Sequence, residues 1–321
     1  MRLVVLAAAL LLATPAAAAS VKVETQEFPV PKGSGPHDVA AAAESGGVIW
    51  IAQQRAGALG RLDPKTCKVD HIALGAGSAP HGVIVGPDGA PWLTDGGQNA
   101  IVRVDPATGA VKVWKLPEDS GYANLNTAAF DGRKRIWFTG QNGIYGRLDP
   151  ASGDIKVWKA PKGSGPYGIT GTPKGGIYYV SLAGSHLAEI DIDSGEAKVI
   201  EPPTPNQGAR RVWSDSKGRL YVSEWNSGQL SRYEPETKTW KVWKLPGQRP
   251  RAYAVYVDES DAAWVSDWGA NALVRFDPET ETFQTFPNRE PNANVRQILG
   301  RKGEVWTPES GPERIVVYRF Q

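Results

Sequence analysis

Two positions that recur along this chain hold most of the side chains that could do chemistry. The first lies at the start of a short apolar segment, in patterns such as Ala-Pro-His-Gly-Val. The second ends the next apolar segment, just beyond its aromatic residue. Imidazole, guanidinium, phenol and amide groups occupy the first position: His37, His81, Asn126, Tyr167, Arg210, Arg251 and Arg296. The second position holds Gln53, Asp95, Gly140, Ser181, Glu224, Asp267 and Glu309.

The charges at these two positions are correlated, because every acid at the second belongs to a segment whose first position is basic. Clustered Arg side chains repel one another, so each would gain from a neighbouring carboxylate. An Arg in such a pair keeps N–H donors for a second acceptor. We therefore expect four pairs, either as a structural network or as the wall of a funnel that binds a small ligand. The pairs are His81 with Asp95, Arg210 with Glu224, Arg251 with Asp267, and Arg296 with Glu309.

His81 and Asp95 also fit the requirements of a general base. A carboxylate fixes the tautomer of a neighbouring His and raises its basicity. His37, from the preceding segment, could complete an acid–base pair or a metal site. The alternative is a hydrogen-bonded pair that only shapes the surface. His81, His37 and Asp95 are therefore the candidate catalytic residues, and the other polar residues at the two positions are candidate ligand-binding residues.

A repeated unit must position these side chains. Residues 249–287 contain four short apolar runs separated by Gly, Pro, Asn or Asp, which is the pattern of a β-meander. An aromatic residue in the second run recurs at intervals of about 41–45 residues, in the range of propeller blades. We expect these aromatic side chains to fill the space between blades. They are Trp50, Trp92, Trp137, Tyr178, Tyr221, Trp264 and Trp306.

The two ends of the chain are predicted to meet. The last unit lacks a fourth strand, and residues 21–29 resemble the fourth-strand segments, such as residues 111–114. Pairing of this N-terminal strand with the last unit would remove an open sheet edge, whereas an open array would leave that unit one strand short. We predict an all-β fold: a seven-bladed β-propeller of four-stranded antiparallel blades, forming a single domain over residues 20–321.

The segments Ala79-Pro-His81-Gly-Val, Gly165-Pro-Tyr167-Gly-Ile-Thr, Ile136-Trp137-Phe-Thr and Trp268-Gly-Ala-Asn-Ala-Leu-Val-Arg275 carry a resemblance to a known family. The chain resembles the streptogramin B (virginiamycin B) lyases, which are seven-bladed propellers. The resemblance covers nearly the whole chain after residue 19. It implies opening of the ester bond of a cyclic depsipeptide by elimination, with a magnesium ion and a His general base near the mouth of the channel.

The chain departs from this family at the catalytic positions. The family pattern has His at the first position of the last two units, with Glu two residues before the final His. Here these positions hold Arg251 and Arg296, and Asn294 replaces the Glu. An Arg neither acts as a base at neutral pH nor binds Mg²⁺. His37 and His81 could form the equivalent site from other blades, although no carboxylate stands two residues before either.

Composition and charge narrow the possible partners. Lys and Arg number 36 against 34 Asp and Glu, so no strong field would recruit nucleic acid or an anionic membrane. Residues 1–19 have the features of a signal peptide: Arg2, an apolar run over residues 3–12, and Ala17–Ala19 before the cleavage site. The run is too short to span a bilayer. Export to a periplasm or the exterior is predicted, and Cys67, the only cysteine, forms no intrachain disulfide.

Three functions remain open. The first is a lyase with His81 or His37 as the base. The second is a non-catalytic, monomeric binding or scaffold propeller that holds an anionic small molecule or acidic peptide in its central funnel. The third, a lactone or sugar-acid hydrolase, ranks last because it needs carboxylates that are free of basic neighbours.

Overall fold

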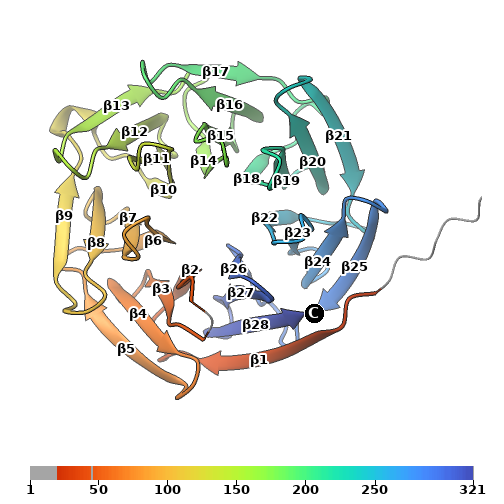
Figure 1. Cartoon of the computed structure of the whole chain (residues 1–321), viewed down its shortest axis with the longest axis horizontal. Coiled ribbons are helices and arrows are strands. Elements are labelled where there is room, and N and C mark those ends of the chain that lie inside the picture. The colour runs from red at the N-terminus through yellow and green to blue at the C-terminus, as the bar shows by residue number, and fades with distance from the viewer. Residues whose placement is uncertain (1–19, 45, 321) are drawn as a thin grey trace, which may run out of the picture.

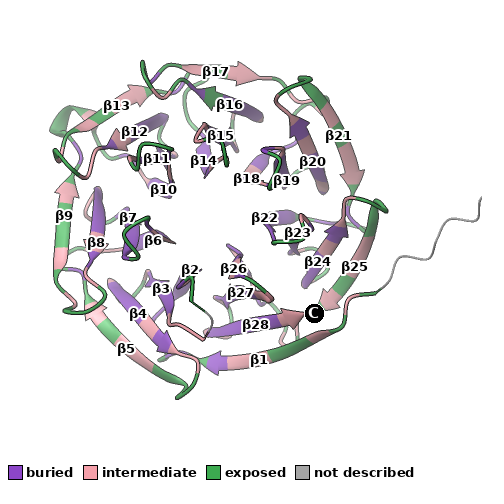
Figure 2. Ribbon diagram, in the orientation of Figure 1, coloured by how far each residue is buried: buried purple, intermediate pink, exposed green. Residues whose placement is uncertain are grey.

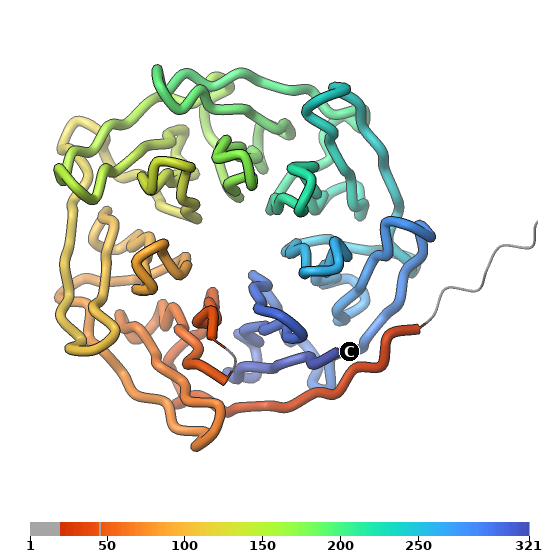
Figure 3. The backbone as a smooth tube through the Cα atoms, viewed as in Figure 1, coloured from red at the N-terminus to blue at the C-terminus, as the bar shows by residue number. Residues whose placement is uncertain are grey.

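The computed structural model describes residues 20–44 and 46–320, in which seven four-stranded antiparallel sheets form a ring (Figure 1). The tube in Figure 3 runs once around this ring, and each sheet starts at the central channel and ends at the periphery. The predicted seven-bladed propeller is confirmed, whereas the predicted signal peptide lies outside the described residues. Within the described ranges, no helix has the length and apolar character needed to cross a membrane.

The first three blades are consecutive meanders. Blade 1 consists of β2 (Pro36–Ala41), β3 (Ile49–Gln53), β4 (Ala58–Asp63) and β5 (Lys68–Ala73). Blade 2 consists of β6 (Pro80–Val85), β7 (Pro91–Asp95), β8 (Ala100–Val104) and β9 (Val111–Lys115). The 3₁₀ turn η1 (Glu118–Ser120) leads to blade 3, which consists of β10 (Leu125–Phe130), β11 (Ile136–Gly140), β12 (Ile144–Leu148) and β13 (Ile155–Lys159).

The next three blades repeat this arrangement. Blade 4 consists of β14 (Pro166–Gly171), β15 (Ile177–Ser181), β16 (His186–Ile190) and β17 (Ala197–Ile200). Blade 5 consists of β18 (Ala209–Ser214), β19 (Leu220–Glu224), β20 (Gln229–Glu234) and β21 (Thr239–Lys244). Blade 6 consists of β22 (Ala252–Val257), β23 (Ala263–Asp267), β24 (Ala272–Asp277) and β25 (Thr282–Pro287).

Blade 7 joins the two ends of the chain, as predicted. It consists of β26 (Leu299–Arg301), β27 (Glu304–Glu309), β28 (Arg314–Phe320) and the N-terminal β1 (Val23–Pro29). Strand β1 pairs antiparallel with β28, from Val23 opposite Phe320 to Pro29 opposite Arg314. Phe28 is fully buried and stacks on Trp306 with ring centroids 5.6 Å apart. Closure therefore combines a complete strand ladder with an aromatic contact in the core.

The core lies between blades, and the recurring aromatic residues fill it. Burial is concentrated in the inner and middle strands, whereas the outermost strands mix residues of intermediate burial with exposed ones (Figure 2). Trp92 of blade 2 packs edge-to-face against Phe130 of blade 3 with ring centroids 5.6 Å apart, and the rings of Trp264 in blade 6 and Phe320 in blade 7 lie 5.3 Å apart. The packing role predicted for these aromatic side chains is confirmed.

A β-bulge interrupts the first strand of blades 1–6 close to its start. In β2 the register shifts between Pro36 and Val39, so His37 and Asp38 lie in the bulge. A bulge leaves a residue outside the ladder and redirects its side chain. This local irregularity is what places polar side chains at the channel.

Candidate functional site at the channel mouth

The bulged ends of the first strands meet at one end of the channel, and we call the side chains there the ring. The rings of His37 and His81 lie 3.9 Å apart, and Nδ2 of Asn126 lies 3.4 Å from Nε2 of His81. The hydroxyl oxygens of Tyr167 and Tyr253 are 2.7 Å apart. The ring consists of His37, His81, Asn126, Tyr167, Arg210, Tyr253 and Arg296, six of which the sequence analysis placed there.

The exception is blade 6, where the prediction of Arg251 was wrong and Tyr253 holds the ring position. Ala252 pairs with Asp267 just as Pro80 pairs with Asp95, so the next residue, Tyr253, corresponds to His81. The dipeptide Pro250-Arg251 resembles Pro-His, but it stands immediately before β22, whereas Pro80-His81 are the first two residues of β6. The spacing contained the correct signal, because Tyr253 precedes Trp264 by the same 11 residues that separate His81 from Trp92.

The four predicted pairs do not form between side chains. Asp95 instead accepts hydrogen bonds from the backbone N–H groups of Ala79 at 2.9 Å and Gln98 at 3.0 Å. Asp267 accepts from the N–H groups of Arg251 at 2.7 Å and Gly269 at 2.8 Å, so Arg251 contacts it only through its backbone. The turns at the mouth have N–H groups with no partner in the ladder, and these carboxylates satisfy them.

The other two acids also bind groups outside the ring. Glu224 accepts a hydrogen bond from the hydroxyl of Ser227 at 2.7 Å, and Glu309 accepts one from Nε of Arg314 at 2.5 Å. Burial raises the pKa of both carboxyl groups. Arg210 and Arg296 are therefore left without the carboxylates that the sequence analysis assigned to them.

Hydroxyl groups on the second strands hold the ring residues in place. Thr94 accepts a hydrogen bond from the N–H of Gly82 at 3.0 Å and donates one to the carbonyl of Asn126 in the next blade at 2.5 Å. Ser223 likewise accepts from the N–H of Arg211 and donates to the carbonyl of Tyr253. Each hydroxyl thus links the bulge of its own blade to the ring residue of the next. The sequence analysis missed this role.

Asp38, also missed, is the carboxylate at the centre of the site. Its Oδ1 atom lies 2.7 Å from Nδ1 of His37 and 3.3 Å from Nη2 of Arg211. Asp38 and Arg211 directly follow ring residues and are almost fully buried. Burial raises the pKa of Asp38, and Arg211 opposes that shift.

The two ring histidines are neutral at physiological pH. Burial and the guanidinium groups of Arg211, Arg296 and Arg210 hold the pKa of His37 well below its ordinary value of 6.5. Burial and the neighbouring His37 hold the pKa of His81 well below 6.5. Because the histidines carry no charge, the Arg side chains give the site an excess of positive charge whether or not Asp38 is ionised.

Three Arg side chains at the mouth stack on aromatic rings, and no carboxylate of the described residues lies within ion-pair distance of them. The guanidinium carbon of Arg210 lies 3.6 Å from the ring centroid of Tyr253 and 4.7 Å from that of Trp225. Arg251 lies 5.5 Å from the Trp225 ring. Arg296 lies 5.1 Å from the ring of Trp268, and the Trp225 and Trp268 rings are 5.6 Å apart. Each guanidinium donates one hydrogen bond within the protein, from Arg210 to the Tyr167 hydroxyl, from Arg251 to the Trp225 carbonyl and from Arg296 to the Ser310 hydroxyl. Contact through the face of the guanidinium leaves its other in-plane N–H groups available to an anion.

Within the described residues, His37, Asp38 and His81 form the one cluster that could hold a metal ion, with ligand atoms within 4.8 Å of one another. Two imidazoles and one carboxylate are the ligands of a transition metal rather than of Mg²⁺, which prefers oxygen. Asp38 also contacts Arg211, whose charge opposes a cation. The residues present therefore do not fit the magnesium ion implied by the resemblance.

Sequence comparison assigns the chain to a family. The pattern of the Virginiamycin B lyase family matches residues 12–242, well over half of the chain. This chain belongs to the virginiamycin B lyase family. No curated protein matches it at the sequence level.

Solved structures show the same propeller as this family member. A streptogramin B lyase structure has a TM-score of 0.84 at 22% identity, covering 93% of this chain and 98% of that chain. The virginiamycin B lyase from Staphylococcus aureus has a TM-score of 0.85 at 20% identity, covering 93% of this chain and 99% of that chain. A YCF48 structure with bound D1 peptide has a TM-score of 0.73 at 13% identity, covering 92% and 97%. At these identities the likeness shows the fold alone.

With Tyr253 in place of Arg251 at the ring position of blade 6, the family's catalytic pattern aligns with different residues of this chain. The two ring positions at which the pattern has His are Tyr253 and Arg296, and Asn294 stands where the pattern has Glu. Blades 6 and 7 thus offer phenol, guanidinium and amide groups instead of a base and a metal ligand. The imidazoles of this family member lie in blades 1 and 2.

Proposed function

We propose that this chain is an exported, monomeric propeller that binds an anionic small molecule at the mouth of its channel. The observation that supports the proposal is the group formed by Arg210, Arg251 and Arg296, which are stacked on aromatic rings and not neutralised by any described carboxylate. Guanidinium groups bind carboxylates through two parallel N–H donors. Several guanidiniums around one mouth favour a ligand with two or more carboxylates over a monoanion.

Ligand-dependent thermal stability tests this proposal. The unfolding temperature is measured with a panel of mono-, di- and tricarboxylates and sugar acids at constant ionic strength. A binding ligand at concentrations well above its Kd should raise Tm by about 2–4 °C or more. If no anion in the panel raised Tm, the mouth would have only a structural role.

Two neighbouring arginines provide a matched pair of variants. Arg251 and Arg249 are both exposed residues of the loop before β22, but only Arg251 stacks on Trp225. Arg251→Gln should weaken binding of the best ligand about tenfold or more, whereas Arg249→Gln should leave it nearly unchanged. Equal effects of the two variants would indicate non-specific attraction to a basic surface.

A second candidate function is the eliminative opening of a cyclic depsipeptide ester, with His37 as the base. The specific observation in its favour is the contact between Nδ1 of His37 and Asp38, which favours the tautomer with a lone pair on Nε2. In this reaction Nε2 removes a proton from the carbon adjacent to the one that carries the ester oxygen. A C=C bond then forms between these two carbons, and the C–O bond breaks to release a carboxylate. The ring of His81 lies 3.9 Å from that of His37, tilted by 45°, and would hold it in place.

Liquid chromatography coupled to mass spectrometry distinguishes the two candidate functions. Elimination opens the ring of a streptogramin B such as quinupristin without a change in mass, which shifts its retention time. Turnover that is lost in His37→Ala but retained in Arg251→Gln would favour the lyase. No turnover at high protein concentration, with or without added divalent metal, would exclude it.

Export can be tested separately from either activity. Fractionation of the producing cell and mass spectrometry of the N-terminus should find mature protein beginning near Ser20 outside the cytoplasm. Full-length protein in the cytoplasm would contradict this part of the proposal. Light scattering on a size-exclusion column tests the expected monomer.

A further inference from the structure

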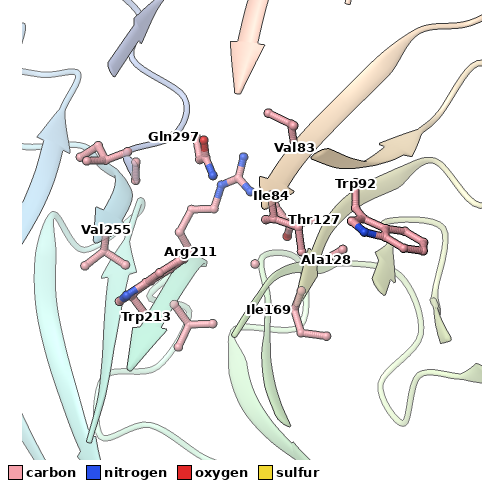
Figure 4. A pocket seen from close by; sticks show the side chains of 15 residues that line it. Val83, Ile84, Trp92, Thr127, Ala128, Ile169, Arg211, Trp213, Val255 and Gln297 are labelled. Atoms are coloured by element: carbon pink, nitrogen blue, oxygen red, sulfur yellow. The ribbon is translucent and has the colours of Figure 1, made fainter. Parts of the chain in front are cut away.

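A small pocket lies in the channel below the ring, lined by the first strands of blades 2–6, by Trp92 of β7, and by Gln297 and Ile298 just before β26 of blade 7 (Figure 4). Its walls are mostly apolar and include Val83, Ile169 and Val255. The space that water can reach is about 30 Å³, room for one or two water molecules. This small space suits a water molecule or an ion of similar size.

A buried guanidinium with unused donors projects into this pocket. Arg211 is 4% exposed and lines the cavity, as Figure 4 shows. Its Nη2 contacts Asp38 at 3.3 and 3.4 Å, but its Nε and Nη1 have no hydrogen-bond partner among the described residues. Burying a charged donor without a hydrogen-bond partner destabilises the fold. We therefore expect a group in the pocket to accept hydrogen bonds from Nε and Nη1.

The amide of Gln297 presents a second donor. Its Oε1 accepts a hydrogen bond from the N–H of Val39 at 2.9 Å, which fixes the orientation of the amide. The Nε2 group is then free to donate, and Figure 4 shows the Gln297 amide at the same end of the pocket as the Arg211 guanidinium. Two sets of N–H donors at one end of a narrow cavity require an acceptor between them.

The charges around the pocket favour an anion over water as that acceptor. Arg210, Arg211 and Arg296 all lie close enough to influence the neutral His37, and Asp38 is the carboxylate that faces Arg211. A water molecule would satisfy the donors but leave the excess positive charge. A monatomic anion satisfies both requirements, and it is not much larger than water.

We propose that the channel holds a single halide ion, chloride under physiological conditions, bound by Nε and Nη1 of Arg211 and by the amide of Gln297. The site lies below the mouth and does not depend on the proposed binding function there. The ion would neutralise part of the charge that the ring would otherwise have to accommodate. It would also hold the first strands of blades 5 and 7 together across the channel.

Bromide locates the ion directly. Crystals soaked in sodium bromide should show one anomalous peak between Arg211 and Gln297 at the bromine absorption edge. Thermal unfolding supplies a second measurement: replacing methanesulfonate with chloride at constant ionic strength should raise Tm by about 2–4 °C. No anomalous peak at this position, together with a Tm independent of halide, would overturn the proposal in favour of bound water.

The variant Gln297→Glu tests the site by placing a carboxylate oxygen where the halide would bind. A glutamate can still accept the hydrogen bond from Val39, and its second oxygen supplies the negative charge that the halide would provide. The variant should fold, and both its Tm increase in chloride and its bromide peak should be lost. Retention of either would refute the site. Arg251→Gln, at the mouth, should keep the full chloride effect, which separates this site from the proposed ligand site.

Discussion

Nη2 of Arg211 lies 3.3 Å from Oδ1 of Asp38, although 173 residues separate the two in sequence. Asp38 belongs to β2 in blade 1 and Arg211 to β18 in blade 5, and these blades are not neighbours in the ring (Figure 1). The ion pair therefore crosses the channel. It is a direct contact between opposite sides of the ring, and the 2.7 Å contact between the hydroxyls of Tyr167 in blade 4 and Tyr253 in blade 6 is a second link between blades that are not neighbours.

Removal of Arg211 should be strongly destabilising. In Arg211→Met the buried Asp38 carboxylate loses its cationic partner, and breaking a buried pair in this way costs about 3–5 kcal/mol. Denaturant unfolding gives the free energy of unfolding. Arg251→Met, which truncates an exposed cation at the mouth, should change it by less than about 0.5 kcal/mol. A cost below about 1 kcal/mol for Arg211→Met would mean that Asp38 is uncharged in the folded protein.

The neutral histidine pair predicts a loss of stability in mild acid. The pKa values of His37 and His81 are lowered on folding, so below about pH 6.5 the unfolded chain binds protons that the folded protein does not. The unfolding free energy should be at its full value above pH 6.5 and fall below it by about 1.4 kcal/mol per pH unit for each histidine.

A difference measurement isolates these two residues. The pKa of Asp38 is raised by burial, which acts in the opposite direction in more acidic solution, and burial also lowers the pKa of His186. The double variant His37→Gln/His81→Asn retains both of these groups. The wild type should lose more stability than the double variant between pH 6.5 and 5.5. Parallel curves would show that folding does not shift the pKa values of the pair.

Sequence reasoning succeeded for the architecture because the signals there are local and repeated. The aromatic residue of the second strand, the turn residues and the spacing between units recur in each blade, so an error in one unit is corrected by the others. Closure was also predictable, since residues 21–29 match the missing strand of the last unit. The pairing of β1 with β28 confirms it.

The details of the site were harder to predict because they depend on register and on contacts across the channel. The Pro250-Arg251 dipeptide imitated a ring motif, while Tyr253 held the position. The correlation between acids and bases did not indicate side-chain pairs, because the turns at the mouth needed acceptors for their own N–H groups. Contacts such as Asp38 with Arg211 join blades that no sequence periodicity relates.

The N-terminal strand should be essential for stability. Phe28 is fully buried against Trp306, and truncation of a buried Phe to Ala costs about 3–5 kcal/mol. Phe28→Ala should therefore lower the free energy of unfolding by this amount without a change in the far-UV spectrum at low temperature. Tyr122→Ala, at a side chain that is 61% exposed, is the matched control and should be nearly neutral. If the two variants had similar stability, β1 would contribute little to closure.

The hydroxyl links between blades make a last prediction, which concerns Thr94. In Thr94→Val the shape of the side chain is kept, but the N–H of Gly82 and the carbonyl of Asn126 lose their shared partner in a buried position. Leaving buried backbone groups unpaired costs about 1–3 kcal/mol, so Thr94→Val should be destabilised by this amount. Thr94→Ser keeps the hydroxyl and should recover most of the loss. The junction is closely packed, since a Cβ at Gly82 would lie 2.8 Å from the Asn126 carbonyl oxygen. A Val variant as stable as the wild type, together with a destabilised Ser variant, would show that the methyl group of Thr94, rather than its hydroxyl, stabilises this junction.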